Sequence, residues 1–84
     1  MLIRVKSLNG RIIEINIDNN SSIKEIKQSI ADKEGIPTGI FFLVYEGRAL
    51  KEDKFLSDYP NITKNSLLSC VVNIIVGWIL KIYL

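Results

Sequence analysis

The chain has 84 residues, of which 48% are hydrophobic and 24% charged, and its net charge is +2. These values are typical of one small globular domain, and so low a charge without a basic run argues against nucleic-acid binding. With no histidine and a single cysteine, a Cys/His metal site and a disulfide framework are excluded, and no cofactor is expected.

The beginning of the chain alternates between apolar and polar residues. The alternation runs over residues 1–7 and again from Ile13 to Ile17, which is typical of strands with one buried face. Gly10, at the end of a Leu-Asn-Gly segment, can take the positive φ of a tight turn. Residues 1–17 therefore predict a β-hairpin.

The period then changes from two to that of a helix. Three isoleucines at positions i, i+3 and i+7 predict a helix over about residues 23–34. Ser22 followed by Glu25 fits a capping box. Gly35 stands where a helix commonly ends, and Pro37 prevents continuation.

Two further strands and a short return strand are expected after the helix. The apolar run 40–45 favours a strand, with a turn at Glu46-Gly47 and a short strand over 48–50. Isolated apolar anchors stand in the polar segment 51–66, namely Phe55, Leu56, Tyr59 and Ile62. The last strand runs from Leu67 to about Asn73. Its inward residues would be Leu68, Cys70 and Val72, and its outward residues Leu67, Ser69 and Val71.

The order strand, strand, helix, strand, short strand, strand predicts an α+β fold, the β-grasp, with one helix against a mixed sheet. We expect a domain over residues 1–73 and an atypical hydrophobic tail over 74–84. The tail contains one charged residue, Lys81. No secretory signal pattern is visible at the start, so a cytoplasmic and nuclear location is expected.

Four separated segments resemble ubiquitin and its relatives. They are Met1–Lys6, Leu8-x-Gly10, Asp32–Pro37 and Leu56–Tyr59. The match is colinear over residues 1–72 apart from one extra residue, Pro60. The hairpin, Tyr45 and Lys54 are closer to the Rub modifiers of neddylation, whereas Leu56–Tyr59 is closer to ubiquitin, so the subfamily stays open.

This resemblance implies a protein modifier and not an enzyme. Members of the family are activated at a C-terminal Gly-Gly, passed between cysteines as a thioester and joined to substrate lysines. Two glycines allow the tail to lie in narrow enzyme channels, because they have no Cβ. The implied partners are activating and conjugating enzymes, substrate lysines and ubiquitin-binding-type domains.

The chain departs from the family at this tail. In register, the Gly-Gly pair falls on Val76 and Gly77, and the two family arginines fall on Asn73 and Ile75. A β-branched valine in place of the first glycine argues against conjugation. Cleavage after Gly77 to give a processed C-terminus is the alternative.

The resemblance also implies a partner-binding patch. Its apolar members here are Leu8, Val44 and Val71, with Ser69 where ubiquitin has histidine; Phe42, Arg48 and Lys6 flank them. Exposed aliphatic residues are common and by themselves indicate no site. Phe42 replaces a family arginine, which would enlarge the patch.

Lysines form the second candidate class, because modifier chains grow on them. Lys6, Lys27, Lys33 and Lys64 occupy family lysine positions; the alternative for each is a solvated surface charge. Arg48 replaces another family lysine, and a guanidinium is no nucleophile for a thioester.

Cys70 is predicted to be a core residue, because a nucleophilic cysteine needs exposure and a basic partner. With no carboxylate pair in a cleft and no phosphate loop, no catalytic residue is assigned.

Three interpretations of the tail 74–84 remain open. As a membrane anchor it is too short, because a spanning helix needs about 20 apolar residues. It could prolong the last strand, pack on the domain or pair with another chain, and a membrane-associated or self-associating protein is the alternative function. It could also be a read-through or frame change with no selected role.

Overall fold

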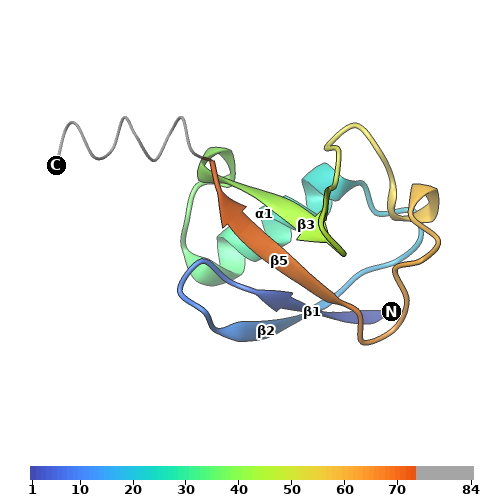
Figure 1. Ribbon diagram of the computed structural model, residues 1–84, viewed down its shortest axis with the longest axis horizontal. Coiled ribbons are helices and arrows are strands. Elements are labelled where there is room, and N and C mark those ends of the chain that lie inside the picture. The colour runs from blue at the N-terminus through green and yellow to red at the C-terminus, as the bar shows by residue number, and fades with distance from the viewer. Residues whose placement is uncertain (74–84) are drawn as a thin grey trace, which may run out of the picture.

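The computed structural model describes residues 1–73, which form a five-stranded mixed sheet packed on one α-helix (Figure 1). The strand order is β2-β1-β5-β3-β4. In chain order the elements are β1 (Leu2–Lys6), β2 (Ile12–Asn16), α1 (Ile23–Glu34), β3 (Phe41–Tyr45), β4 (Arg48–Ala49) and β5 (Leu67–Val72). The predicted α+β architecture, the β-grasp, is therefore confirmed.

The first hairpin has the predicted turn and buried face. Gly10 has a φ of 86°, and β1 pairs antiparallel with β2 so that Ile3 lies opposite Ile15. Ile3 and Val5 are fully buried. On its other side β1 pairs in parallel with β5, which is feasible because α1 lies in the crossover between them.

Helix α1 begins and ends at the predicted residues. The Ser22 hydroxyl accepts a hydrogen bond from the Glu25 N–H at 3.0 Å. The predicted reciprocal half of the capping box is wrong, since the Glu25 carboxylate accepts from the Ser22 hydroxyl instead. Gly35 ends the helix with a φ of 69°, and its N–H donates to the Ala31 carbonyl.

The second hairpin begins one residue later than predicted, because Thr38–Ile40 forms a short 3-10 turn. Glu46 and Gly47 both have positive φ, 51° and 80°, the backbone of a two-residue hairpin turn whose twist matches that of the strands. This turn places Ala49 opposite Val44.

Two residues expected to be covered are exposed. Val72 lies opposite buried Phe41 and so faces the helix side as predicted, but at the end of β5 it is 44% exposed. Phe55 is 49% exposed, because the 3-10 turn Leu56–Asp58 that follows directs Leu56 into the core instead. Ile62 and Leu68 are buried as predicted, and Tyr59 and Cys70 pack partly against the core.

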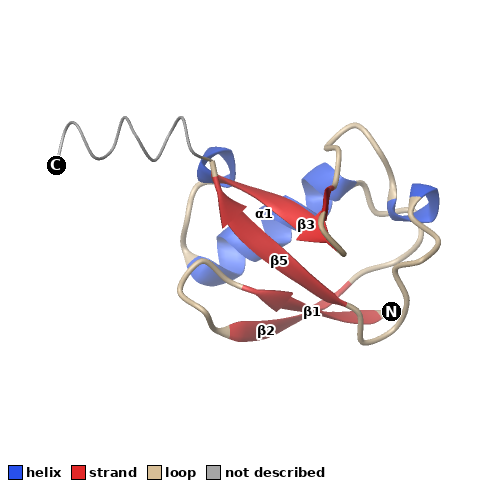
Figure 2. Cartoon of the chain, in the orientation of Figure 1, coloured by secondary structure: helices blue, strands red, loops and turns tan. Residues whose placement is uncertain are grey.

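Helix α1 covers only one face of the sheet (Figure 2). The core between them contains Ile23, Ile26 and Ile30 from the helix and Leu43 from β3, each at most 1% exposed. Within residues 1–73, none of the helices is long and apolar enough to cross a membrane. The tail 74–84 lies outside the described residues, so its boundary with the domain stays a prediction.

Candidate functional site

The uncovered face of the sheet, here called the outer face, is defined by strand register. Residues directly opposite each other on paired strands point to the same side, and neighbours along a strand point to opposite sides. Because Ile3, Val5, Leu43 and Leu68 face the helix, the alternate residues face outward. From β3 and β5 these are Phe42, Val44, Leu67, Ser69 and Val71.

Four of these residues form a compact group, here called the β3–β5 patch: Phe42, Val44, Ser69 and Val71. Phe42 lies opposite Val71, and Val44 lies opposite Ser69. Val71 is 38% exposed, and the other three are partly exposed. The register therefore brings together four of the residues predicted for partner binding on one open surface.

The other predicted patch residues border this group or lie apart from it. Leu8 lies in the turn after β1 and is partly buried against the core, so it offers less free surface than predicted. Arg48 lies opposite Tyr45, whose ring packs partly against the core, and not opposite Val44. The prediction that Arg48 flanks the patch therefore has to be corrected: by register it belongs to the other side of the strand, at the sheet edge.

Two outer-face residues were missed by the sequence analysis. Ala49 lies opposite Val44 and extends the β3–β5 patch toward the sheet edge. Ile12 is 55% exposed and lies farther along the same face, as does Leu67, which was predicted to face outward and is 37% exposed. The position of Ala49 could have been predicted from the Glu46-Gly47 turn. A two-residue turn fixes the hairpin register, and this register places Ala49 opposite Val44.

The predicted modification lysines do not have equal access to solvent. Lys6 and Lys64 are exposed, which suits a solvated charge and a modification site alike. Lys27 is buried, with 6% of its side chain exposed; it forms an ion pair with Glu52 and its Nζ lies 5.2 Å from the centre of the Phe41 ring. The structure therefore contradicts an accessible amine at Lys27.

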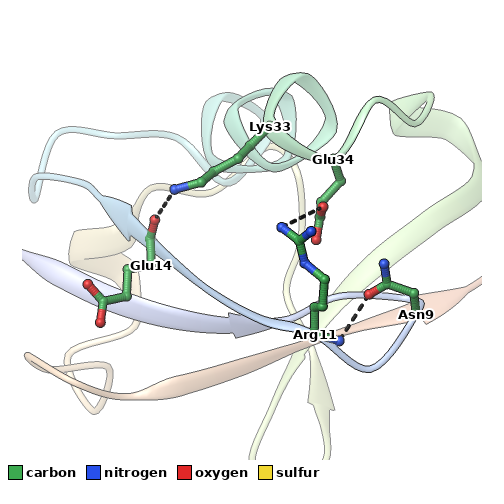
Figure 3. A network of polar contacts seen from close by, with 5 residues as sticks. All are labelled: Asn9, Arg11, Glu14, Lys33 and Glu34. Atoms are coloured by element: carbon green, nitrogen blue, oxygen red, sulfur yellow. Dashed lines mark hydrogen bonds and ion pairs between the residues drawn. The ribbon is translucent and has the colours of Figure 1, made fainter.

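Lys33 is exposed but engaged in a contact between α1 and the hairpin. Its Nζ donates a hydrogen bond of 2.9 Å to the Glu14 carbonyl of β2. Next to it, Arg11 lies 3.6 Å from the Glu34 carboxylate, and the Arg11 N–H donates to the Asn9 side chain (Figure 3). Modification of Lys33 would therefore require this contact to open.

Glu34 and Glu52 differ in environment although each faces a cation. The Glu34 side chain is 7% exposed, and its Oε1 has no hydrogen-bond partner among residues 1–73. Glu52 remains half exposed. The hydrogen bond from Lys27 and the charge of Lys27 lower the pKa of Glu52.

Cys70 lies on the helix side of β5 and is partly buried. Burial, with a smaller contribution from the nearby Glu34 charge, raises the pKa of the Cys70 thiol to about 11. A nucleophilic cysteine requires the opposite shift, so Cys70 is suited to packing and not to catalysis.

We therefore expect native Cys70 to react slowly with iodoacetamide at pH 8. Its thiolate fraction should lie on the order of 100-fold below that of an unperturbed thiol, and partial burial also limits access. The measurement compares alkylation rates in buffer and in denaturant by mass spectrometry. Equal rates in the two conditions would contradict this assignment, and a cysteine-containing peptide serves as the reagent control.

No group of three or more metal-ligating side chains occurs in residues 1–73. The predicted processed C-terminus, Gly77, lies outside the described residues.

The mixed five-stranded sheet, its single covering helix and its open outer face define a β-grasp domain of the ubiquitin-like class. The model of the ubiquitin family matches residues 3–74, and the chain belongs to the ubiquitin family.

Relatives give the same assignment. The chain is 42% identical to ubiquitin-like protein NEDD8 of Dictyostelium discoideum over 72 residues, covering 86% of this chain and 92% of that protein. It is 38% identical to the NEDD8-like protein RUB3 of Arabidopsis thaliana, covering 86% and 91%. It is 42% identical to ubiquitin-like protein 1 of Schizosaccharomyces pombe, covering 70% and 76%.

The chain is thus a ubiquitin-like protein related to the NEDD8 and Rub modifiers, a family without enzymatic activity. Membership implies binding to domains that recognise ubiquitin-like proteins and to conjugation enzymes in general.

Proposed function

We propose that this protein is a binding module of the protein-modification system, which acts by presenting its β3–β5 patch to ubiquitin-binding-type domains. The observation that carries the proposal is the register of Phe42 with Val71 and of Val44 with Ser69 on the face that α1 leaves open. Such a surface gains free energy when a partner removes its apolar area from water.

The surroundings of the patch favour a particular kind of partner. Lys6 lies opposite Ser69 on the outer face and is exposed. An amphipathic helix with an apolar stripe and an acidic flank would complement this arrangement. The cytoplasm and nucleus are the proposed locations of this binding module.

Action as a conjugated tag is the alternative within the same system. The sequence at the family's Gly-Gly position is Val76-Gly77, and a β-branched residue has a Cβ that a narrow channel does not admit. We therefore propose binding without conjugation, and exposed Lys6 and Lys64 would then be solvated charges.

A thioester assay separates the two functions. The full chain and a chain ending at Gly77 are incubated with ubiquitin- or NEDD8-type activating enzyme, conjugating enzyme and ATP, and products are resolved with and without DTT. We expect no DTT-sensitive adduct from either chain. The matched control restores glycine with Val76→Gly in the chain ending at Gly77. An adduct from the unaltered chain would establish the tag function.

The binding function is tested by calorimetry with a panel of ubiquitin-binding domains. Val44→Ala should weaken binding about fivefold or more, because truncating a central apolar contact costs more than ~1 kcal/mol. Leu8→Ala should have a smaller effect, since Leu8 packs partly against the core. Phe55→Ala, at an exposed aromatic outside the sheet, is the control. Unchanged affinity for Val44→Ala would refute the patch.

A second candidate, membrane association or self-association through residues 74–84, is favoured by the composition of that segment, which has nine apolar residues among eleven. It predicts sedimentation with vesicles or as oligomers. Monomeric protein that does not bind vesicles would exclude this candidate.

A further inference from the structure

The end of the described chain lies beside the β3–β5 patch. Asn73 follows β5 directly, and its N–H donates a 2.8 Å hydrogen bond to the Ile40 carbonyl, which continues the β3–β5 ladder by one step. Val71, two residues earlier, points outward opposite Phe42. The described chain therefore ends at the apolar end of the patch.

The segment that follows has the composition of a buried element. Residues 74–84 contain nine apolar residues, including Trp78, and one charge, Lys81. Such a segment in water exposes apolar area that association would remove. The patch beside it has exposed apolar area of its own, since Val71 is 38% exposed and Phe42 and Val44 are partly exposed.

We propose that residues 74–84 dock in cis on the β3–β5 patch of the same molecule. Gly77 divides the segment into a three-residue exit and a seven-residue apolar stretch, and glycine allows the chain to reverse there. The patch extends from the Phe42–Val71 pair, two residues before Asn73, to the Val44–Ser69 pair, two residues farther along the strand. At about 3.3 Å per residue the seven residues span roughly 23 Å, whereas the path from Gly77 back past Asn73 is about 20 Å to the first pair and about 26 Å to the second, so the stretch covers the Phe42–Val71 end and approaches Val44.

The tether favours this occupant over a second copy of the chain. A segment joined to its site by a few residues has an effective concentration in the mM range, far above that of separate molecules in a dilute sample. Phe42 strengthens the argument, because it places an aromatic ring on the outer face at the exit of the segment.

Docking has a consequence that rests on the proposed function. The segment would occupy the surface offered to partners, so partners would bind only the fraction of molecules in which it is released. With one molecule in ten released, the apparent affinity falls on the order of tenfold.

Trp78 provides a direct test, since it is the only tryptophan of the chain. In the full chain we expect blue-shifted Trp78 emission and weak quenching by acrylamide. Val71→Asp and Val44→Asp should shift the emission to the red and increase quenching, whereas Phe55→Asp, at an exposed site outside the sheet, should not. Far-UV circular dichroism checks that each variant is folded.

The outcomes separate the alternatives. Emission typical of exposed indole in the unaltered chain, or emission insensitive to both patch variants, overturns the proposal. Emission that shifts on dilution, with dimers in sedimentation velocity, assigns the patch to a second copy and also overturns it. Protected Trp78 without any partner binding would support docking while the proposed function fails.

A tail variant tests the consequence for partners. In the full chain, Ile79→Asp/Ile82→Asp should release the segment, expose Trp78 and increase affinity for a ubiquitin-binding domain about tenfold. Red-shifted emission with unchanged affinity would refute the autoinhibitory role. Failure of both the variant and the unaltered chain to bind would instead count against the proposed function.

Discussion

Leu43→Ala is expected to lower the free energy of unfolding by about 2–5 kcal/mol, the range measured for removing a buried leucine side chain. Leu43 is 0% exposed and lies in β3, between β4 and β5, so the cavity would open at the centre of the sheet. A domain of this size has a total stability of about 5–15 kcal/mol. Urea unfolding followed by circular dichroism measures the change.

Ile12→Ala is the matched control for this variant, because it also shortens an aliphatic residue in a strand. Ile12 is 55% exposed on the outer face, so the change should stay within about 0.5 kcal/mol. A similar loss for both variants would show that the core does not lie between α1 and the sheet. Since Leu43 is the neighbour of Val44, its loss should also weaken partner binding.

Glu52→Ala is expected to destabilise the protein by about 3 kcal/mol, although Glu52 is half exposed. The reason lies in its partner, because Lys27 is buried and its ammonium would lose the ion pair, keeping the Phe41 ring 5.2 Å away. Removing one member of a buried ion pair costs about 3–5 kcal/mol. We take the lower end, because water reaches the Glu52 side of the pair. Denaturant unfolding at pH 7 gives the value.

Lys27→Met is the control, since it removes the charge and keeps an unbranched apolar side chain of similar size. It should cost little, because the Glu52 carboxylate that it leaves without a partner is 54% exposed and stays hydrated. Glu52→Ala in the Lys27→Met background should then have only a small effect. A large loss in that background would mean that Glu52 acts through another contact.

The same pair makes stability depend on pH. The pKa of Glu52 is lower in the folded protein than its ordinary value, so the unfolded chain takes up the proton first as pH falls. The stabilisation is therefore fully present above the ordinary carboxylate pKa and is lost as pH falls through the folded value. Lys27→Met should remove this contribution, and parallel acid titrations of the two proteins would measure it.

The periodic features of the fold were predictable from the sequence. Alternation along the hairpin predicted the burial of Ile3 and Val5, and Gly35 marked the end of α1. Their positions depend on local backbone geometry and on the burial of apolar side chains, and both can be predicted from a short stretch of sequence. Alternation also predicted that Ser69 and Val71 face outward, whereas the grouping of Phe42, Val44 and Val71 in one patch came from the resemblance to the ubiquitin family.

The features that the sequence analysis missed depend on contacts between residues far apart in the chain. Lys27 stands at i+4 from Ile23 and i−3 from Ile30, on the apolar stripe of α1, so its position carried a signal of burial. Its charge hid that signal, because the compensating Glu52 lies 25 residues away. The exposure of Val72 depends on where β5 ends. Of the neighbours Phe55 and Leu56, only Leu56 is buried in the core, because of the 3-10 turn that begins there.

The position of β5 has a consequence for synthesis. This strand is the last element described, yet it lies in the middle of the sheet, between β1 and β3. A nascent chain that stops before Leu67 holds two separate hairpins and a helix with no strand to join them. Contacts between distant parts of a chain form slowly, and here the pairing that joins the two hairpins into one sheet cannot begin until the last strand has emerged. Folding of this domain is therefore expected to follow its translation, and a ribosome stalled before Leu67 would carry an unfolded chain.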